Sequence, residues 1–361
     1  MRRHLALLSA VLVTATASLG LYAGPAFADG STPAAGPAVN PLSTAAAPAA
    51  KPKPAKPAKP KPAKPAPSAV KGSVRIYLFD AFYAQHKTLI VPERGLHITG
   101  IVRPYVAGQQ VTVRAYLGKR SISQQTLAVT PMRGGRSGRV VDTVKAPAPG
   151  TLHLEITHRR TAQMLGFVAR RGVASLDPHA GFGSSGSFVA LIQSRLAALH
   201  VYIPQTGVYD QETGLALDAY HRLLGHGTSQ DLDGLTVSDL LDGRGAFTVR
   251  YPHDGKHVEG DLGNQLLAEI NGGKVYAIYP ISSGKPSTPT ILGRFRVYQR
   301  TPGYLPDGMY YSDFFYGGYA IHGYDPAPDY AASHGCMRLP ITDAISVWNW
   351  LTIGVAVDVY Q

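Results

Sequence analysis

The sequence predicts a multidomain, mainly β protein in which a β-sandwich, a small helical module and a second β domain follow one another. Residues 73–175 and 250–361 contain short runs that alternate between apolar and polar positions, as half-buried strands do. Residues 182–245 change to the spacing of amphipathic helices. A proline-rich stretch precedes all three and marks the point where folded structure is expected to begin.

The N-terminal segment, residues 1–28, has the pattern of an export signal. Two arginines precede an uncharged apolar run that ends at Ala23, and the small residues around 26–28 suit a signal peptidase. Because the run approaches the ~20 residues that span a bilayer, an uncleaved membrane anchor is the alternative. Either interpretation places the rest of the chain outside the cytoplasm, with membrane contact only if the segment is uncleaved.

Residues 29–72 form a predicted linker rich in alanine, lysine and proline. The run KPKPAKPAKPKPAKPAP at 51–67 places proline at every second or third position, which removes backbone donors and favours the polyproline conformation. The lysines repel one another, so the sequence predicts a stiff spacer, with an unstructured tail as the alternative.

The formal net charge of +12 is concentrated near the N-terminus. Residues 1–67 hold eight Lys and Arg against one acidic residue, a net charge of +7, which leaves +5 on the rest of the chain. This balance does not support a basic nucleic-acid-binding surface, so no nucleic-acid partner is expected. The lysines instead favour contact with an anionic cell envelope.

Residues 73–175 contain strand-like runs separated by turns rich in Gly, Pro and Arg, among them SVRIYLF, QQVTVRAYL and GTLHLEITHR. The regular alternation of strand and turn predicts a small immunoglobulin-like sandwich. The region contains no group of residues typical of a catalytic or metal site, so its expected role is that of a spacer or a protein contact.

Residues 182–245 predict a small helical module. Apolar residues recur at helical intervals in its first half. They are Phe188, Leu191, Ile192, Leu196 and Leu199. A glycine turn at Gly207 then precedes a second helix.

The pattern of this module resembles the peptidoglycan-binding family 1 domain, notably at Leu191, Gly207 and Thr213. The resemblance implies glycan binding. His200 replaces the family's usual glycine and the closing half is weak, so a module used only for packing is the alternative.

Residues 250–361 predict a mainly β domain with one helix. The run KHVEGDLGNQLLAEINGGKVYAIYPISSG indicates three strands with a hairpin turn at 271–273, and GRFRVYQR and GVAVDVYQ indicate two more. A helix is expected at 342–351, with a buried stripe. The stripe comprises Ile345, Trp348 and Leu351.

The only cysteine of the chain, Cys336, lies in the stretch ASHGCMRLP. Exported proteins use cysteines mostly in pairs, so a single one indicates a reactive thiol, with a small buried hydrophobe as the common alternative. A cysteine nucleophile needs a base and donors for an oxyanion. Gly335 permits unusual backbone angles, so we expect neighbouring N–H groups to converge on an oxyanion.

Two histidines are candidate bases for this thiol, His334 two residues before it and His322 in YAIHGYD. Side chains at i and i+2 are too crowded for in-line proton transfer, so geometry favours His322, presented from a neighbouring strand. A His-x-Cys pair also suits a metal. No second cysteine and no His-x₃-His or His-Glu pattern accompanies it, so no metal is expected.

IHG at 321–323 followed by SHGCMR at 333–338 resembles the signature of the L,D-transpeptidase (YkuD-type) catalytic domain. The segment SSGKPSTPTILGRFRVY at 282–298 is similar to the family's Ser-Thr-Gly…Thr-Pro-x-Gly-x-Phe-x-Val segment, with one additional residue. The resemblance covers roughly 255–361. The insert between the two signature parts is shorter than in several branches of the family.

This resemblance implies an enzyme that cross-links peptidoglycan stem peptides, third residue to third residue. Cys336 would attack the third residue of a tetrapeptide stem and release D-alanine, with His322 as base and with N–H groups near His334, Gly335 and Cys336 around the oxyanion. A second stem's amine would then take the acyl group. A thiol–imidazole pair needs no cofactor, so none is implied.

The resemblance also implies substrate contacts by Ser333 and Arg338, and Arg338 would either hold a stem carboxylate or brace the loop. An aromatic substrate wall is expected, with core packing as its alternative. Its candidates are Tyr298, Met309, Tyr310, Phe314 and Tyr316.

The implied partners are peptidoglycan stems and glycan, the implied covalent inhibitors are β-lactams of the carbapenem class, and the implied location is the cell wall of a bacterial envelope. An L,D-carboxypeptidase or endopeptidase would use the same residues and differ only in resolving the acyl-enzyme with water. A wall-binding scaffold without catalysis is the third hypothesis, and the intact motif argues against it.

Overall fold

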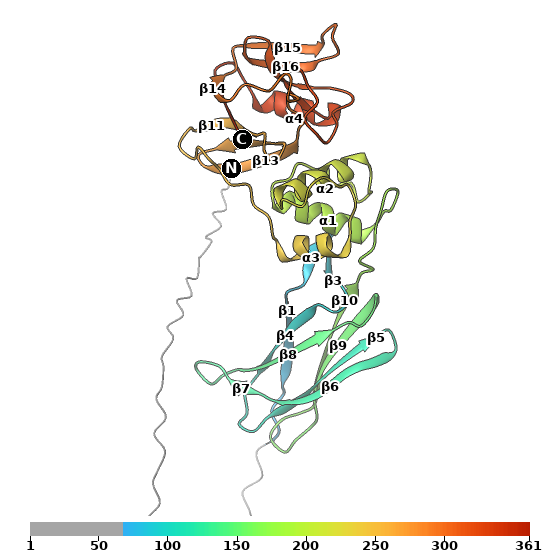
Figure 1. Cartoon of the computed structure of the whole chain (residues 1–361). Coiled ribbons are helices and arrows are strands. Elements are labelled where there is room, and N and C mark those ends of the chain that lie inside the picture. Colours follow the sequence, from blue (N-terminus) through green and yellow to red (C-terminus); the bar gives the residue numbers. More distant parts are fainter. Residues whose placement is uncertain (1–67) are drawn as a thin grey trace, which may run out of the picture. The chain divides into compact units, whose positions relative to one another are not determined.

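A computed structural model describes residues 68–361. The export signal and the linker up to residue 67 lie outside the described residues. In chain order, Figure 1 shows a β-rich domain, a group of three helices and a second β-rich domain, so the mainly β, multidomain fold class is confirmed. No helix within residues 68–361 is long and apolar enough to cross a bilayer.

The first domain is a sandwich of two sheets, with strand orders β1-β4-β8-β7 and β2-β3-β10-β9-β5-β6. Alternate residues of its strands point into one core, as the period-two pattern indicates; Leu96 and Ile98 of β4 and Leu152 and Leu154 of β9 are examples. The strands are β1 (Ser73–Phe79), β2 (Phe82–Ala84), β3 (Lys87–Ile90), β4 (Gly95–Arg103), β5 (Gln110–Leu117), β6 (Arg120–Ala128), β7 (Thr130–Pro131), β8 (Gly138–Lys145), β9 (Gly150–His158) and β10 (Phe167–Ser175).

The helical module consists of α1 (Ser187–Ala198), α2 (Gln211–Leu223) and α3 (Gly234–Asp242). The third helix lies in the half that the sequence pattern left weak. It has clear end signals, because the Asp233 side chain accepts a hydrogen bond from the Thr236 N–H at 2.7 Å and Gly243 ends the helix with φ +71°.

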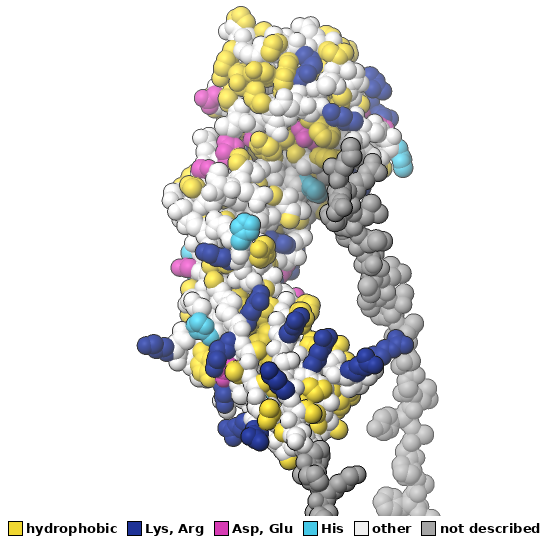
Figure 2. Space-filling model, turned by 180° about the vertical axis from the view of Figure 1, so that it is seen from behind, with side chains coloured by type: hydrophobic (Ala, Val, Ile, Leu, Met, Phe, Trp, Pro, Cys, Tyr) yellow, Lys and Arg dark blue, Asp and Glu magenta, His cyan; other side chains and the backbone are white. Residues whose placement is uncertain are grey.

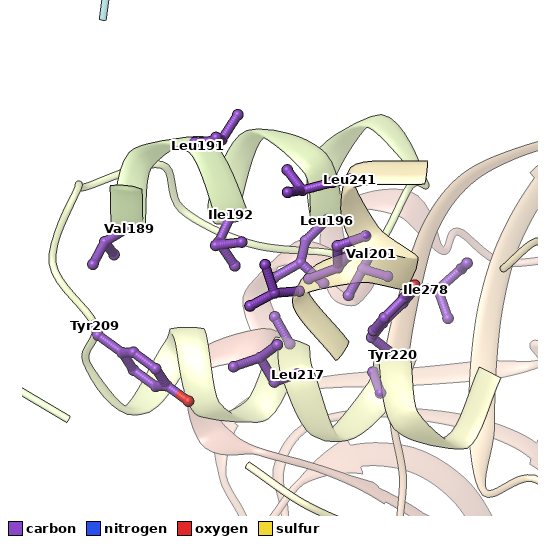
Figure 3. Packing of buried hydrophobic residues seen from close by; sticks show 14 of the residues in the cluster. Val189, Leu191, Ile192, Leu196, Val201, Tyr209, Leu217, Tyr220, Leu241 and Ile278 are labelled. Carbon is purple, nitrogen blue, oxygen red and sulfur yellow. The ribbon is translucent and has the colours of Figure 1, made fainter. Parts of the chain in front are cut away.

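The core of this module extends beyond its own helices. Figure 3 shows Leu196 and Leu217 packed among other buried side chains, with Ile278 of the following domain beside them. The backbone continues this contact, because the Ile278 N–H donates to the His200 carbonyl at 2.8 Å and the Tyr202 N–H donates to the Ile278 carbonyl at 3.0 Å. The module therefore packs directly against the second β domain.

The second β domain has two sheets, ordered β13-β12-β11-β19-β14 and β15-β16-β17-β18. The pair β15–β16 was not predicted from the sequence. The elements are β11 (Lys256–Asp261), β12 (Leu266–Asn271), β13 (Lys274–Pro280), β14 (Gly293–Arg296), β15 (Gln299–Tyr304), β16 (Tyr310–Tyr316), β17 (Tyr319–Gly323), β18 (Met337–Leu339), α4 (Ile341–Trp350) and β19 (Ala356–Tyr360).

The stripe predicted for α4 was partly wrong. Ala344, Val347 and Leu351 are buried, whereas Ile345 is 37% exposed. Leu351 is buried as predicted, and Trp348 is half-buried. Ala344 and Val347 take the buried positions one residue before Ile345 and Trp348, because the small alanine side chain allows α4 to approach Gly323 closely.

A buried arginine ties α2 to the second β domain. The Arg222 guanidinium lies 2.5 Å from the Asp218 carboxylate and donates to the carbonyls of Gln265 and Ile281, at 2.9 and 3.0 Å. Both members of the ion pair are 4% exposed. The three acceptors explain why a charged side chain is tolerated there.

Arg222→Ala is expected to lower the free energy of unfolding by about 3–5 kcal/mol, because it leaves the Asp218 carboxylate buried without a partner. The measurement is urea unfolding followed by circular dichroism. The matched control is Arg94→Ala, since both side chains of the Arg94–Asp242 ion pair are about one-third exposed (35% and 34%) and its loss should cost at most about 1 kcal/mol. Equal losses of unfolding free energy in the two variants would contradict this stabilising role of Arg222.

Candidate active site

The two parts of the sequence signature meet in a pair of parallel strands. Strand β17 carries His322, and β18 begins directly after Cys336; Ile321 pairs with Met337 and His322 with Arg338. Ile321 and Met337 are buried in the domain core. Because side chains alternate along a strand, His322, Cys336 and Arg338 point to the opposite face. The neighbouring strand thus presents the histidine on the same face as the thiol.

The loop before the cysteine is held by Ser333. Its Oγ accepts a hydrogen bond from the Gly335 N–H at 3.0 Å and donates to the Cys336 carbonyl at 2.6 Å. Its backbone N–H donates to the Ser283 carbonyl at 2.9 Å. Ser333 is completely buried, so its hydroxyl acts within the loop.

Gly335 is required at its position. Its φ is +125°, a conformation that L side chains rarely adopt. A Cβ atom there would lie 2.5 Å from a ring carbon of Tyr319, which packs over the loop. The missing side chain therefore allows an aromatic ring to cover the residue before the thiol.

The thiol is half-buried in a polar backbone setting. Sγ of Cys336 lies 3.6 Å from the Gly318 carbonyl oxygen. Burial raises the pKa of the Cys336 thiol, and the Ala320 N–H and the charge of Arg338 oppose this rise. Cys336 is therefore a neutral thiol at pH 7.

His322 is neutral as well. It is 2% exposed, and Nδ1 lies 2.9 Å from the Gly323 carbonyl oxygen, so Nδ1–H donates and Nε2 is the proton acceptor. Burial lowers the pKa of His322 to about 4, and the hydrogen bond to Gly323 opposes this shift. The described contacts include no hydrogen bond between His322 and Cys336, whose positions are offset by two residues along the paired strands.

Because Cys336 and His322 are both neutral, we expect a characteristic pH dependence for alkylation of Cys336 by iodoacetamide. The rate should rise roughly tenfold per pH unit through neutrality and level off only above the usual cysteine pKa of about 8.5, because only the thiolate reacts. The measurement is the alkylated fraction against time, by mass spectrometry. A plateau below pH 7 would reveal a thiolate–imidazolium pair and contradict this electrostatic account.

His334 points to a different neighbour. Its side chain is exposed, and Nε2 lies 3.2 Å from the Nζ of Lys285. The lysine segment is fixed to the loop, because the Lys285 N–H donates to the Ser333 carbonyl at 3.0 Å. The Nε2 atom is therefore engaged with Lys285 and is not directed at the thiol.

Arg338 lies beside the base. It is half-buried, its guanidinium carbon is 4.0 Å from the centre of the Tyr324 ring, and that ring meets the His322 ring edge-on at 5.8 Å. Its Nε is buried and has no hydrogen-bond partner within residues 68–361. Arg338 thus braces the site through the Tyr324 ring, and its Nε–H remains free to donate a hydrogen bond.

The residues predicted for an aromatic wall differ in exposure. Tyr298 and Tyr316 are 50% and 51% exposed, whereas Met309 is buried. Tyr310 and Phe314 are half-buried. The Tyr316 ring lies 6.2 Å from that of Tyr319, so this tyrosine continues the aromatic surface that covers Gly335. Met309 belongs to the packed interior instead.

Three residues beside the site were not singled out from the sequence: Tyr319, Tyr324 and Lys285. Tyr319 and Tyr324 flank His322 at i−3 and i+2, a proximity that the sequence shows. Lys285 is 49 positions from His334, and only the fold brings the two together. Within residues 68–361, no group of three His, Cys, Asp or Glu residues is placed to hold a metal ion.

Comparisons with known proteins relate the part of the chain that carries this site to a known family. A family model described as the L,D-transpeptidase catalytic domain (YkuD) matches residues 255–359. The L,D-transpeptidase (residues 123–326) from Xylanimonas cellulosilytica DSM 15894 is 30% identical and covers 51% of this chain and 100% of its own, with a TM-score of 0.46. A search of curated proteins found no match.

Two further solved structures are similar to this chain. The catalytic domain from the E. faecium L,D-transpeptidase is 29% identical and covers 30% of this chain and 98% of its own, with a TM-score of 0.27. The Ldtfm–avibactam carbamoyl enzyme is 26% identical and covers 35% of this chain and 61% of its own, with a TM-score of 0.28.

Proposed function

Because this chain belongs to the L,D-transpeptidase family of peptidoglycan-modifying enzymes, we propose that it cross-links stem peptides, third residue to third residue, through an acyl-enzyme on Cys336. The observation that carries this proposal is the parallel pair β17–β18, which presents a neutral imidazole and the only thiol on one face. A neutral imidazole is the form that accepts a proton.

In the first step, the thiol proton passes to Nε2 of His322 as Sγ bonds to the carbonyl carbon of the third stem residue. The bond between that carbon and the D-alanine nitrogen then breaks. His322 returns the proton to the leaving amine, so D-alanine departs neutral at nitrogen and a thioester remains on Cys336. The hydrogen bond from Nδ1–H to Gly323 keeps the imidazole in the required tautomer throughout.

The oxyanion of this step needs backbone donors close to the thiol. The Gly335 N–H already donates to Ser333 Oγ, so we assign the role to the N–H groups of His334 and Cys336. Gly335 then contributes through its backbone conformation, which only glycine adopts without strain.

In the second step, the side-chain amine of another stem attacks the thioester carbon. His322 takes the amine proton and passes it to the departing sulfur, which restores the neutral thiol. An amine competes with water for the same intermediate, so the enzyme must bind the acceptor near the thioester. Tyr316 and Tyr319, which form an aromatic surface beside the loop, are our candidates for that contact.

Arg338 is proposed to bind a stem carboxylate while it braces the site. Its guanidinium has no carboxylate partner within residues 68–361, and its Nε is a buried donor without an acceptor. A carboxylate would satisfy that donor.

The proposed location is the bacterial envelope, where peptidoglycan stems are found, and the N-terminal segment would direct export. Carbapenems are the proposed covalent inhibitors, because a strained β-lactam carbonyl is an acyl donor for the same thiol. Glycan binding by the helical module stays a prediction.

Product analysis tests the proposed function. The protein is incubated with disaccharide-tetrapeptides, and the products are separated and weighed by mass spectrometry. Dimers joined between third residues, with one D-alanine released per bond, are the expected result. Trimmed monomers alone would show that water resolves the acyl-enzyme and would make the protein an L,D-carboxypeptidase. Unchanged substrate would favour a non-catalytic scaffold.

A further inference from the structure

The net charge of the described chain is divided unevenly between its domains. Residues 73–175 hold fifteen Lys and Arg against four Asp and Glu, a net charge of +11. Residues 176–361 hold eleven against eighteen, a net charge of −7. Figure 2 shows the basic side chains gathered over the β-sandwich, in the lower part of the view. A polyanion would be attracted to the sandwich and repelled by the domains that follow it.

Arginine accounts for most of this charge, with twelve arginines against three lysines in residues 73–175. Any cation raises solubility, but a guanidinium also presents two parallel donors that match the oxygens of phosphate and carboxylate groups. The bias therefore points to recognition of oxyanions in addition to a general positive charge.

A hollow of about 360 Å³ lies on the sandwich between β1 and β10. Strand β1 is the edge of its sheet, and β3 pairs only with the end of β10, so the first part of β10 is an open edge too. Three arginines and a tyrosine are among the residues that line the hollow: Arg75, Tyr77, Arg170 and Arg171.

The arginines of this hollow are only partly neutralised. Arg170 forms an ion pair with Glu155 at 2.8 Å, and that carboxylate is shared with Arg114. Arg75 and Arg171 are exposed and form no ion pair within residues 68–361. Tyr77, which also lines the hollow, is 47% exposed. The hollow thus offers two free guanidinium groups and a ring to an external ligand.

We propose that this hollow binds a phosphodiester polymer, with successive phosphates on Arg75 and Arg171 and the linking polyol or sugar against Tyr77. The distribution of charge favours a flexible polymer over a membrane. Arg139 lies in the same cross-strand row as Arg75 on one sheet, whereas Arg171 belongs to the other sheet. A flat bilayer meets one face, while a polymer can follow the basic side chains across the open edges of both sheets.

The test measures binding of fluorescently labelled poly(glycerol phosphate) to the full-length protein. Fluorescence anisotropy is recorded at low and at physiological ionic strength. The double variant Arg75→Gln with Arg171→Gln should bind at least about tenfold more weakly, because each guanidinium–phosphate contact is charge-assisted. The matched control, Lys119→Gln with Arg133→Gln, removes the same charge from turns outside the hollow and should change affinity by less than about threefold.

Several outcomes would overturn the proposal. Equal losses in the two double variants would show that only the overall charge matters. Tighter binding to vesicles of phosphatidylglycerol, to poly-L-glutamate or to a single-stranded oligonucleotide would assign the surface to a membrane, to carboxylates or to nucleic acid. Circular dichroism and the product assay on soluble stems should be unchanged in both variants, and the binding result stands whether or not the protein is a transpeptidase.

Discussion

Cys336→Ala is expected to abolish covalent modification by a carbapenem and to reduce transpeptidation below detection. Alanine has no nucleophile, and no second cysteine exists in the chain to replace it. The wild type should gain the mass of one inhibitor molecule, because the β-lactam ring opens without losing atoms. Intact-protein mass spectrometry measures this gain.

A matched control variant distinguishes the role of the thiol from the role of the rest of its loop. His334→Gln removes the neighbouring imidazole and its contact with Lys285, yet should leave the adduct in place and the activity within a few-fold of the wild type. An adduct that persists on the Cys336→Ala protein would place the nucleophile elsewhere and contradict the assignment.

His322→Gln is expected to lower kcat/KM by roughly 10²–10⁴, the usual contribution of a general base. In the wild type, kcat/KM should fall as the pH drops towards 4, because protonation of His322 removes the proton acceptor and the pKa of His322 is about 4. The measurement is the initial rate of D-alanine release between pH 3.5 and 8, a range set around that value.

A second measurement separates proton transfer from mere packing. Above the thiol's raised pKa, Cys336 ionises without a base, so iodoacetamide should alkylate the wild type and the His322→Gln variant at similar rates there. His334→Gln is again the control and should keep the wild-type pH profile. If His334→Gln lost activity as severely as His322→Gln, the assignment of the base would be wrong.

The local signals in the sequence were sufficient to predict the fold class and the residues of the candidate site that lie close to the thiol along the chain. The motif around Cys336 and the apolar run before His322 identify two short segments, and the register of β17 with β18 places them together. Period-two alternation depends on neighbouring residues alone and predicts a strand but not its partner, so the pairing of β17 with β18 comes from the fold.

Other features depend on contacts between distant residues and left no local signal. Lys285 meets His334 across 49 positions, and Arg222 reaches carbonyls 43 and 59 positions away. Two of the three positions predicted for the α4 stripe were one residue too late, because the tight approach to Gly323 favours alanine at the interface, which a periodicity of large apolar residues does not reveal. The net charge of residues 68–361, taken as an average, likewise concealed a basic sandwich followed by acidic domains.

The most direct test of the central claim is time-resolved mass spectrometry of the wild-type protein mixed with disaccharide-tetrapeptides. We predict a transient protein species heavier by the mass of the stem minus one D-alanine. Proteolysis should locate this mass on the peptide that contains Cys336, and it should decay as the third-to-third dimer appears. Dimers that accumulate while Cys336 remains unmodified, or an acyl group on any other residue, would contradict the account.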